Sequence, residues 1–485
     1  MKKLLYLFVF IFGSVCTLSA KVTLPSLVGD NMVLQQQSDV KIWGWSEPNA
    51  SVKITTSWGT KGSVKSDNEG NWNFTITTPA ASYTSHTITV SDGEPVVIKN
   101  ILIGEVWLCS GQSNMEMTFT GFWGSPVIGA NQAIEESGLY PNLRLFTVAK
   151  NSATTPQKDC KGSWQISSPA ATRNFSAVGY YYGLQLQRIL NVPVGIINSS
   201  WGGTIIEAWI DAESQKDFTD VDLNLLNDEK FPVYGKPVSC YNGMIAPLVN
   251  YSLRGFIWYQ GESNVPRFST YADKMVTLIK FWRTLWADNN MPFFYAEIAP
   301  YNYAANRLDR TEAQINAALL REKQANVMEM INNVGMVCTN DLVSPYEREE
   351  IHPSNKMEVA RRFSYWALHN TYGFDDALSV IGPQYKSMRV ENGRAVLSFS
   401  GVDGEGITVK GDISGFEVAG NDHVFYPASV LKVFPNVTEL TVFSDKVTEP
   451  VAVRYCFRNF SIGNVSNVYG QPMVPFRTDD WNRTN

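Results

Sequence analysis

The middle of the chain alternates short apolar runs with polar or glycine-rich corners and longer helical patterns. This alternation constrains the fold more than any other feature. The apolar runs span residues 101–109, 143–149, 192–197, 256–259, 292–298 and 334–338. One helix is indicated by apolar residues at the spacing of a single helix face, namely Tyr271, Met275, Leu278, Trp282 and Leu285. Strands that alternate with helices imply a parallel sheet covered on both faces. We therefore predict an α/β domain over residues 101–375.

Both flanks of this domain have a β texture. Residues 51–58, 72–78 and 86–90 are rich in Val, Ile, Thr and aromatic residues, with turn signals between them. The same texture returns after residue 373. Because 485 residues exceed one ordinary core, we predict an N-terminal β-sandwich module over residues 21–100 and a C-terminal β-rich module over residues 376–485.

The first twenty residues have the pattern of a secretory signal peptide. Lys2 and Lys3 precede an apolar stretch over residues 4–12, and small residues surround Ala20. We expect cleavage near Ala20 and export to the periplasm or the extracellular space. Cys16 also permits a lipoprotein interpretation, but Val15 stands where such a signal expects a small residue.

Charge and cysteine usage exclude several classes of function. The chain has 40 Lys and Arg against 46 Asp and Glu, a formal charge of −6. This balance argues against nucleic acid or an anionic membrane as the main partner and favours a weakly charged ligand. The six cysteines are scattered without a C-x-x-C pair. They are expected to be mostly buried free thiols, and the four histidines form no metal-binding motif, so we expect no cofactor.

Polar residues follow four of the predicted strands, at residues 110–115, 198–204, 260–264 and 339–341. In doubly wound sheets, ligands bind beyond the carboxyl ends of the strands. Each segment alone reads as an ordinary loop. Together they predict a site that gathers hydroxyl, amide, glycine and carboxylate groups at one edge of the sheet.

Ser113 is the candidate nucleophile of this site. It follows a strand and is expected to open a helix, although it could also serve simply as a helix N-cap. Its flanking sequence lacks the second glycine of the G-x-S-x-G elbow, which disfavours an α/β-hydrolase. His352 is the candidate base by elimination among the four histidines, the alternative being an exposed loop histidine beside two acids.

Two further residues are candidate donors for an oxyanion. Gly203 offers a backbone N–H and Asn264 a side-chain amide, which would join the N–H of Ser113. The alternative interpretations are a tight turn for Gly203 and a helix cap for Asn264.

The motifs around these residues resemble the four blocks of the SGNH (GDSL-like) hydrolases, and more narrowly the bacterial sialate O-acetylesterase family. The resemblance covers nearly all of the chain after the signal peptide. It rests on residues 104–116 (GEVWLCSGQSNME), 201–204 (WGGT), 207–209 (EAW), 241–247 (YNGMIAP), 258–264 (WYQGESN), 351–353 (IHP) and 475–479 (PFRTD).

The resemblance implies a flavodoxin-like three-layer esterase domain with flanking β-sandwich modules and no metal. It also implies removal of acetyl groups from the hydroxyls of sugars, here sialic acids, through an acetyl-Ser113 intermediate. His352 would be the general base and then the general acid. Gly203 and Asn264 would take the oxyanion roles, with Gln112 beside them in oxyanion or substrate binding.

The acid that orients His352 departs from the family pattern, in which an Asp stands just ahead of the histidine. Here Glu349 precedes His352 by three positions and Glu350 by two, while Asp341 follows a predicted strand. We prefer Glu349, with Glu350, Asp341 or a backbone carbonyl as alternatives. Two alternative functions also stay open: an acetylxylan or other polysaccharide deacetylase, and a carbohydrate-binding protein without activity.

Overall fold

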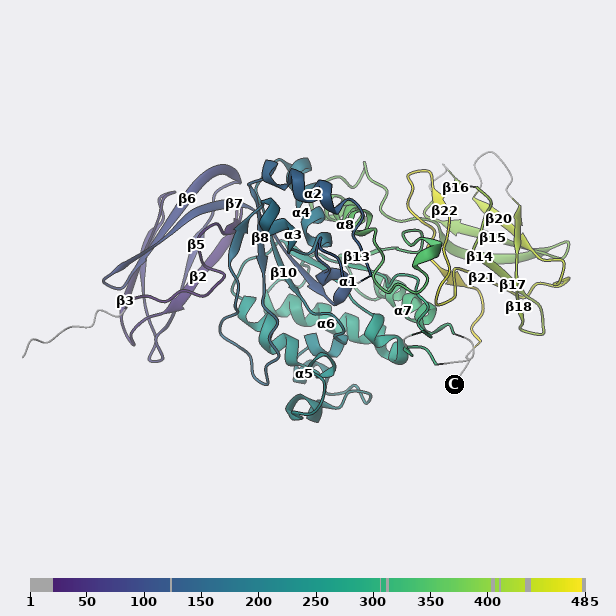
Figure 1. Cartoon of the computed structure of the whole chain (residues 1–485), viewed down its shortest axis with the longest axis horizontal. Coiled ribbons are helices and arrows are strands. Elements are labelled where there is room, and N and C mark those ends of the chain that lie inside the picture. The colour runs from purple at the N-terminus through teal and green to yellow at the C-terminus, as the bar shows by residue number, and fades with distance from the viewer. Residues whose placement is uncertain are drawn as a thin grey trace, which may run out of the picture.

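The computed structural model describes residues 21–122, 124–305, 307–310, 314–402, 406–409, 411–431 and 438–481. The signal peptide expected over residues 1–20 lies outside these described residues. The chain forms three parts in a row, with a β module at each end and an α/β domain between them (Figure 1). Mixed α/β structure between all-β flanks is the fold class that the sequence predicts.

The α/β domain is built on a parallel sheet with the strand order β13-β12-β11-β7-β10-β8-β9, in which only the edge strand β9 runs antiparallel to its neighbour. Its strands are β7 (Pro95–Gly111), β8 (Leu143–Thr147), β9 (Trp164–Ile166), β10 (Val194–Ser200), β11 (Gly255–Tyr259), β12 (Phe293–Ala296) and β13 (Val334–Val337). The helices are α1 (Ser113–Glu116), α2 (Ala130–Glu136), α3 (Pro169–Arg173), α4 (Ala177–Leu190), α5 (Ala212–Gln215), α6 (Tyr271–Leu285), α7 (Asn316–Met330) and α8 (Lys356–Thr371).

Helices cover both faces of this sheet because its strands carry apolar side chains on both. In β7, Trp107 and Cys109 join one buried cluster with residues of α4 and α8. Val106 and Leu108 point the other way and join a second cluster with residues of α6 and α7. The result is a three-layer domain. Helix α6 has the bounds that its apolar spacing predicts.

Strand β7 is shared by two parts of the molecule. Its first half pairs with β1 (Val33–Gln35) and β6 (Ser82–Ser91) of the N-terminal module, and its second half pairs with β10 and β11. The boundary predicted at residue 100 therefore falls inside a continuous strand. The buried residues of the N-terminal module belong to the same cluster as those under α6 and α7. The other strands of this module are β2 (Asp39–Trp45), β3 (Ser51–Thr56), β4 (Lys61–Lys65) and β5 (Asn71–Thr77).

The C-terminal module has a hydrophobic cluster of its own. The strands of its described residues form two four-stranded sheets and one two-stranded sheet. They are β14 (Gln384–Glu391), β15 (Arg394–Ser400), β16 (Ile407–Val409), β17 (Phe416–Ala419), β18 (Phe425–Pro427), β19 (Ser429–Leu431), β20 (Glu439–Phe443), β21 (Ala452–Tyr455), β22 (Val465–Asn467) and β23 (Phe476–Arg477).

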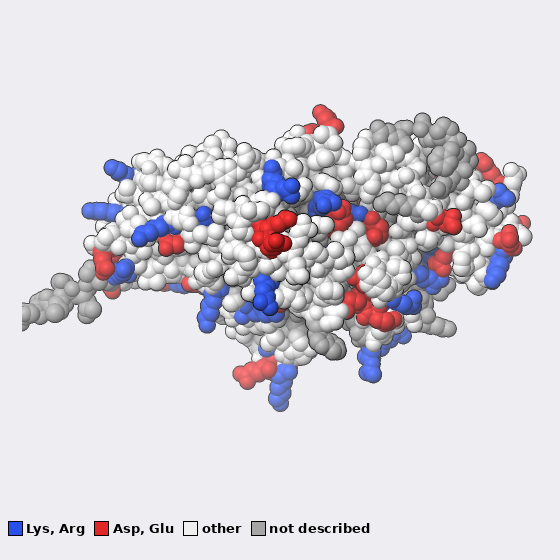
Figure 2. All heavy atoms as spheres, turned by 45° about the horizontal axis from the view of Figure 1, so that its top comes forward, with Lys and Arg blue, Asp and Glu red and all other residues white. Residues whose placement is uncertain are grey.

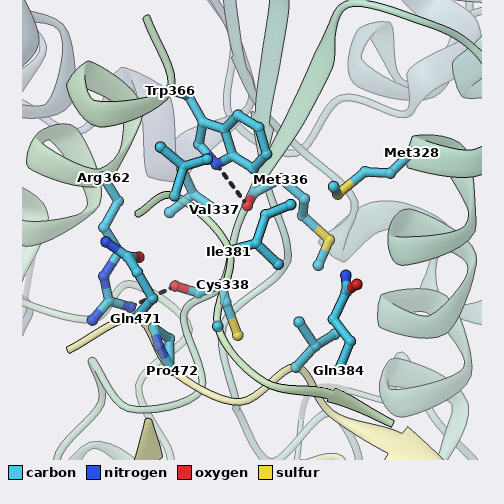
Figure 3. Close-up of a pocket in the computed structure, with 13 residues that line it drawn as sticks. Met328, Met336, Val337, Cys338, Arg362, Trp366, Ile381, Gln384, Gln471 and Pro472 are labelled. Atoms are coloured by element: carbon cyan, nitrogen blue, oxygen red, sulfur yellow. Dashed lines mark hydrogen bonds between the residues drawn. The ribbon is translucent and has the colours of Figure 1, made fainter. Parts of the chain in front are cut away.

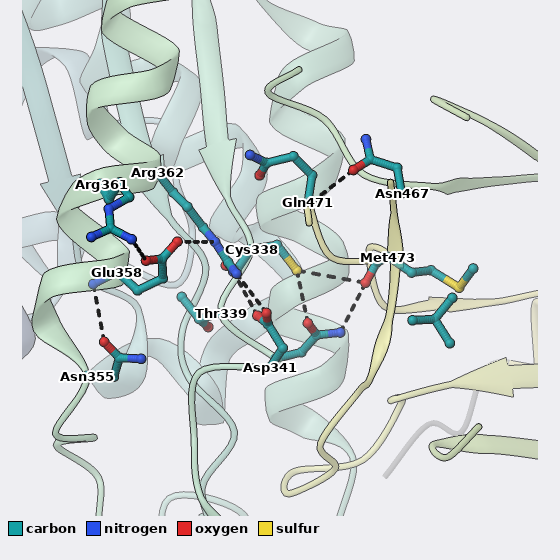
Figure 4. Close-up of polar contacts among 12 residues, drawn as sticks. Cys338, Thr339, Asp341, Asn355, Glu358, Arg361, Arg362, Asn467, Gln471 and Met473 are labelled. Carbon is teal, nitrogen blue, oxygen red and sulfur yellow. Dashed lines mark hydrogen bonds and ion pairs between the residues drawn. The ribbon is translucent and has the colours of Figure 1, made fainter. Parts of the chain in front are cut away.

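The contact between the C-terminal module and the α/β domain is closely packed. A cavity of about 20 Å³, which is about the size of one water molecule, lies between Trp366 of α8 and Pro472 (Figure 3). Beside it, Asn340 donates a hydrogen bond to the backbone oxygen of Met473 at 3.0 Å (Figure 4). The C-terminal module is thus fastened to the edge of the sheet beyond β13.

The distribution of charged side chains, histidines and cysteines can be compared with what the composition predicts. On the face that Figure 2 shows, acidic and basic side chains are interspersed rather than gathered by sign. Among the described residues, no helix is long and apolar enough to cross a membrane, and no group of three or more His, Cys, Asp or Glu side chains is placed to hold a metal ion. The cysteines in the described part of the chain are buried free thiols, as expected.

Candidate active site

A cavity of about 480 Å³ opens at the carboxyl ends of the central strands. It is bordered by segments that follow β7, β8, β10, β11 and β12 and by the loop before α8. Its lining residues are Gln112, Ser113, Glu116, Phe122, Lys150, Gly202, Gly203, Glu262, Ser263, Leu308, Ile351 and His352. The rule that polar strand ends meet at one edge of the sheet therefore leads to a real cavity.

The turn after β7 brings Ser113 to this cavity. Gly111 has φ +132°, and a side chain there would collide with the backbone oxygen of Tyr259 in the neighbouring strand. The chain can therefore turn tightly and begin α1 at Ser113. Gly202, from the segment after β10, lies against the serine, since a Cβ added to it would be 3.2 Å from Ser113 Cβ.

Two backbone N–H groups at the cavity are available to a ligand. In the described chain, neither the N–H of Ser113 nor that of Gly203 has a backbone or side-chain acceptor. Gly203 has φ +78°, which a side chain would strain. The neighbouring Gly202 N–H, by contrast, donates to Glu116 Oε2 at 2.6 Å. Gln112 lines the cavity as well, and its Oε1 accepts a hydrogen bond from the N–H of Gly261 at 3.2 Å.

His352 lies in the loop that leads into α8, and its ring meets Phe122 edge to face at 4.9 Å. The pKa of His352 is lowered to about 4, first by burial and then by the nearby ammonium group of Lys356, against a smaller opposing effect of Glu350. The imidazole is therefore neutral near pH 7 and can accept a proton. No hydrogen bond joins Ser113 to His352 in the described chain. Catalytic hydrogen bonds of this kind often form only when substrate is bound.

The carboxylate beside His352 is that of Glu350 and not that of Glu349. Glu350 Oε1 lies 3.6 Å from His352 Nδ1 and accepts the backbone N–H of His352 at 3.2 Å. Glu349 instead accepts a hydrogen bond from Asn302 at 2.7 Å. The acid beside the imidazole in this structure is therefore Glu350, one of the alternatives, and not the preferred Glu349, whose carboxylate is bonded to Asn302. Asp341 is also occupied, by a two-bond pair with Arg362 (Figure 4).

Asn264 does not face the cavity. Its side chain is fully buried, its Oδ1 accepts from the N–H of Ile206 at 3.0 Å, and its Nδ2 donates to Glu207 at 3.0 Å. Glu207 is in turn paired with the buried Lys274 at 2.8 Å. The prediction of Asn264 as an oxyanion donor is thus not supported by this structure. Its amide holds the segment after β11 against the segment after β10.

Sequence reasoning missed three buried polar residues on the segments that form the site. Glu262 lines the cavity, and its Oε1 accepts from Asn114 Nδ2 at 2.5 Å. Lys356 Nζ donates to Asn114 Oδ1 at 2.6 Å. Burial raises the pKa of Glu262 and lowers that of Lys356 to about 7. Asn114 and Glu262 could have been found from their places in the motifs around Ser113 and Asn264. Lys356 was marked only by its position four residues after His352.

Comparisons with known proteins agree with this fold. A family model described as "Carbohydrate esterase, sialic acid-specific acetylesterase" matches residues 103–364, more than half of the chain. The crystal structure of XAC1771, a carbohydrate acetylesterase from Xanthomonas citri, is 33% identical and superposes with a TM-score of 0.83, covering 95% of this chain and 100% of that one.

Sialate O-acetylesterases of mammals are similar as well. The protein of Mus musculus is 26% identical in an alignment that covers 92% of this chain and 93% of the mouse protein. The protein of Homo sapiens is 27% identical in an alignment that covers 74% of this chain and 72% of the human protein.

The fold and the comparisons define a carboxylic-ester hydrolase built on a three-layer α/β domain. Within that class, the chain belongs to the sialic acid-specific acetylesterase family of carbohydrate esterases. It is accordingly a carbohydrate O-acetylesterase, and its substrate is an O-acetylated carbohydrate.

Proposed function

We propose that the protein removes O-acetyl groups from sialic acids through an acetyl-enzyme formed on Ser113, with His352 as the proton carrier. The observation that supports this most is that both residues line one cavity, beside backbone N–H groups for which the described residues supply no acceptor. The description of the matching family and the names of the mammalian relatives support the choice of sialic acid.

The reaction has two halves. In the first, neutral His352 takes the hydroxyl proton of Ser113 as Oγ attacks the acetyl carbonyl carbon. The tetrahedral intermediate then collapses, the bond to the sugar oxygen breaks, and the imidazolium returns the proton to the departing sugar hydroxyl. In the second half, water attacks the acetyl-Ser113 carbonyl with His352 again as base, and acetate leaves as Ser113 is regenerated.

Charge on the carbonyl oxygen is stabilised in both halves by the N–H groups of Ser113 and Gly203, with the Gln112 amide beside them. Loss of one such donor costs roughly 10²–10³ in rate. Glu350 holds the imidazole from the Nδ1 side and stabilises its charged form.

The serine mechanism is tested by acetate release from a small aryl acetate. Ser113→Ala and His352→Ala are each expected to abolish turnover without loss of the fold, and chelators are expected to leave the rate unchanged. Substantial activity in the Ser113→Ala protein would refute the mechanism.

The sugar is tested separately, by comparing rates on O-acetylated sialic acids with rates on acetylated xylan. Faster acetate release from the sialic acids is expected. Equal or faster release from xylan would overturn the substrate and leave a polysaccharide deacetylase with the same machinery.

Export belongs to the proposal as well. Its support is the basic and apolar pattern of residues 2–12 followed by the small residues near Ala20. Fractionation of cells that express the full chain, with N-terminal sequencing of the product, is expected to find a shortened protein outside the cytoplasm. An uncleaved protein in the cytoplasm would refute export.

A further inference from the structure

A single buried amide connects the segments that carry the two proposed reacting residues. Asn114 directly follows Ser113 and is completely buried. Its Nδ2 donates to the backbone oxygen of Ile351 at 3.1 Å, and Ile351 directly precedes His352. Its Oδ1 accepts from Lys356, the first residue of α8, at 2.6 Å.

The same amide also reaches the segment after β11. Asn114 Nδ2 donates to Glu262 Oε1 at 2.5 Å, and Glu262 is the first residue of η7 (Glu262–Thr270). Three chain segments that are far apart in the sequence therefore meet on one side chain. Both N–H groups and the oxygen of the amide are used.

From these contacts we propose that Asn114 is a positioning residue, whose amide fixes the histidine loop relative to the nucleophile turn. The inference rests on the proposed Ser113–His352 mechanism and adds a residue to it. Asn114 does not line the cavity, so it acts through its neighbours and not on the substrate.

The surroundings explain why an amide suits this place. Lys356 is 1% exposed and Glu262 is also 1% exposed, and no hydrogen bond joins the two side chains directly. Asn114 presents its oxygen to the cation and its nitrogen to the carboxyl group, so each buried charge receives a partner of matching polarity. An apolar residue would leave both without that partner, and Asp would place a second carboxylate against Glu262.

The catalytic consequence follows from the demands of proton transfer. Ser113 Oγ and His352 must come within hydrogen-bond distance during the reaction, and their segments meet through this bridge. Displacement of a reacting group by about 1 Å costs roughly 10² in rate. Removal of the bridge should therefore lower kcat, while the cavity walls and KM stay nearly as they are.

The test compares Asn114→Ala with Asn467→Ala in the full chain, using an aryl acetate. Asn467 is an equally suitable buried amide, since it is 3% exposed and donates to Ser379 at 2.9 Å and to the backbone oxygen of Ile381 at 3.1 Å in the C-terminal module. Rates are expressed per reactive serine, counted by labelling to completion with a fluorophosphonate, so that loss of folded protein does not count as loss of kcat.

For Asn114→Ala, kcat per reactive serine is expected to fall about 100-fold, with KM within about twofold of the unmodified protein. Asn467→Ala is expected to lower thermal stability but to keep its kcat. A kcat within about threefold for Asn114→Ala, a rise in KM alone, or an equal loss in Asn467→Ala would overturn the proposal.

Two milder variants cover the case in which Asn114→Ala does not fold. Lys356→Met and Glu262→Gln each weaken one contact of the bridge and are expected to lower kcat about three- to tenfold. Their effects should be non-additive in the double variant, because both act through one amide. Additive effects would overturn the bridge.

If Ser113→Ala stayed active, the proposed mechanism itself would fail. An inactive Ser113→Ala protein beside a fully active Asn114→Ala protein would refute only the inference about Asn114.

Discussion

Ester hydrolysis should persist to a lower pH than is usual for an enzyme with a histidine base. Burial and the Lys356 ammonium lower the pKa of His352 from 6.5 to about 4. At pH 5, an imidazole with a pKa of 6.5 would be about 3% neutral, whereas one with a pKa near 4 is about 90% neutral. Because the neutral form is the base, kcat/KM at pH 5 should be about 90% of its plateau value, roughly thirty times what an ordinary histidine would allow.

The assay is the pH dependence of kcat/KM for an aryl acetate between about pH 3.5 and pH 8. The folded fraction needs to be followed by circular dichroism at each pH. The pKa of His352 is lower in the folded than in the unfolded chain, so the native state binds fewer protons. Its contribution to stability is therefore present above about pH 6.5 and is lost as the pH falls toward 4.

Two variants identify the group that titrates. Lys356→Met removes a positive charge that lowers the pKa of His352, so the acid limb should move to higher pH. His369→Gln, on the last turn of α8, changes a histidine outside the cavity and should leave the profile unchanged. An acid limb near pH 6.5 in the unmodified protein, with the fold intact, would refute the reasoning.

Four further substitutions have defined outcomes. Glu350→Gln should lower kcat/KM about tenfold or more, because Glu350 lies beside the imidazole, whereas Glu349→Gln should lower it less than about twofold. The reverse order in the same assay would make Glu349 the acid that orients His352. Gly202→Ala should lower kcat about tenfold, since the added methyl group would press on Ser113 at 3.2 Å, and an unchanged kcat would contradict this. Asn264→Ala should lower the free energy of unfolding by about 2–4 kcal/mol in urea denaturation, because it leaves buried polar partners unpaired. A loss under about 1 kcal/mol would mean that these partners find others.

The sequence was sufficient for the fold class and for the position of the cavity. Helix α6 could be predicted because five apolar residues repeat on one face, and that face packs on the sheet. The strand ends were informative because parallel strands deliver their following residues to one edge. That rule alone brings Ser113, Gly203 and Gln112 to the same cavity, and His352 joins them from the loop before α8.

The direction of individual side chains in the loops could not be predicted. Glu349 and Glu350 are adjacent in a loop, and no periodicity tells which of them turns toward His352. The sequence also gave no sign that the Asn264 amide is bound to Glu207, which comes from another segment of the chain. Contacts of this kind join distant parts of the chain and have no local signature.

The bridge through Asn114 was invisible for the same reason. Its partners stand 148 and 242 positions away along the chain. Composition and spacing can mark each residue as polar, but only the folded chain shows that their hydrogen-bonding groups match.

The continuity of β7 has a consequence for how this enzyme can be divided. A fragment that begins at residue 101 would start in the middle of a strand and lose β1 and β6, which pair with its first half. Strand β7 runs for 17 residues and ends two residues before Ser113. The amino-terminal module thus supports the strand that leads to Ser113, and it cannot be exchanged in a chimaera without rebuilding that strand.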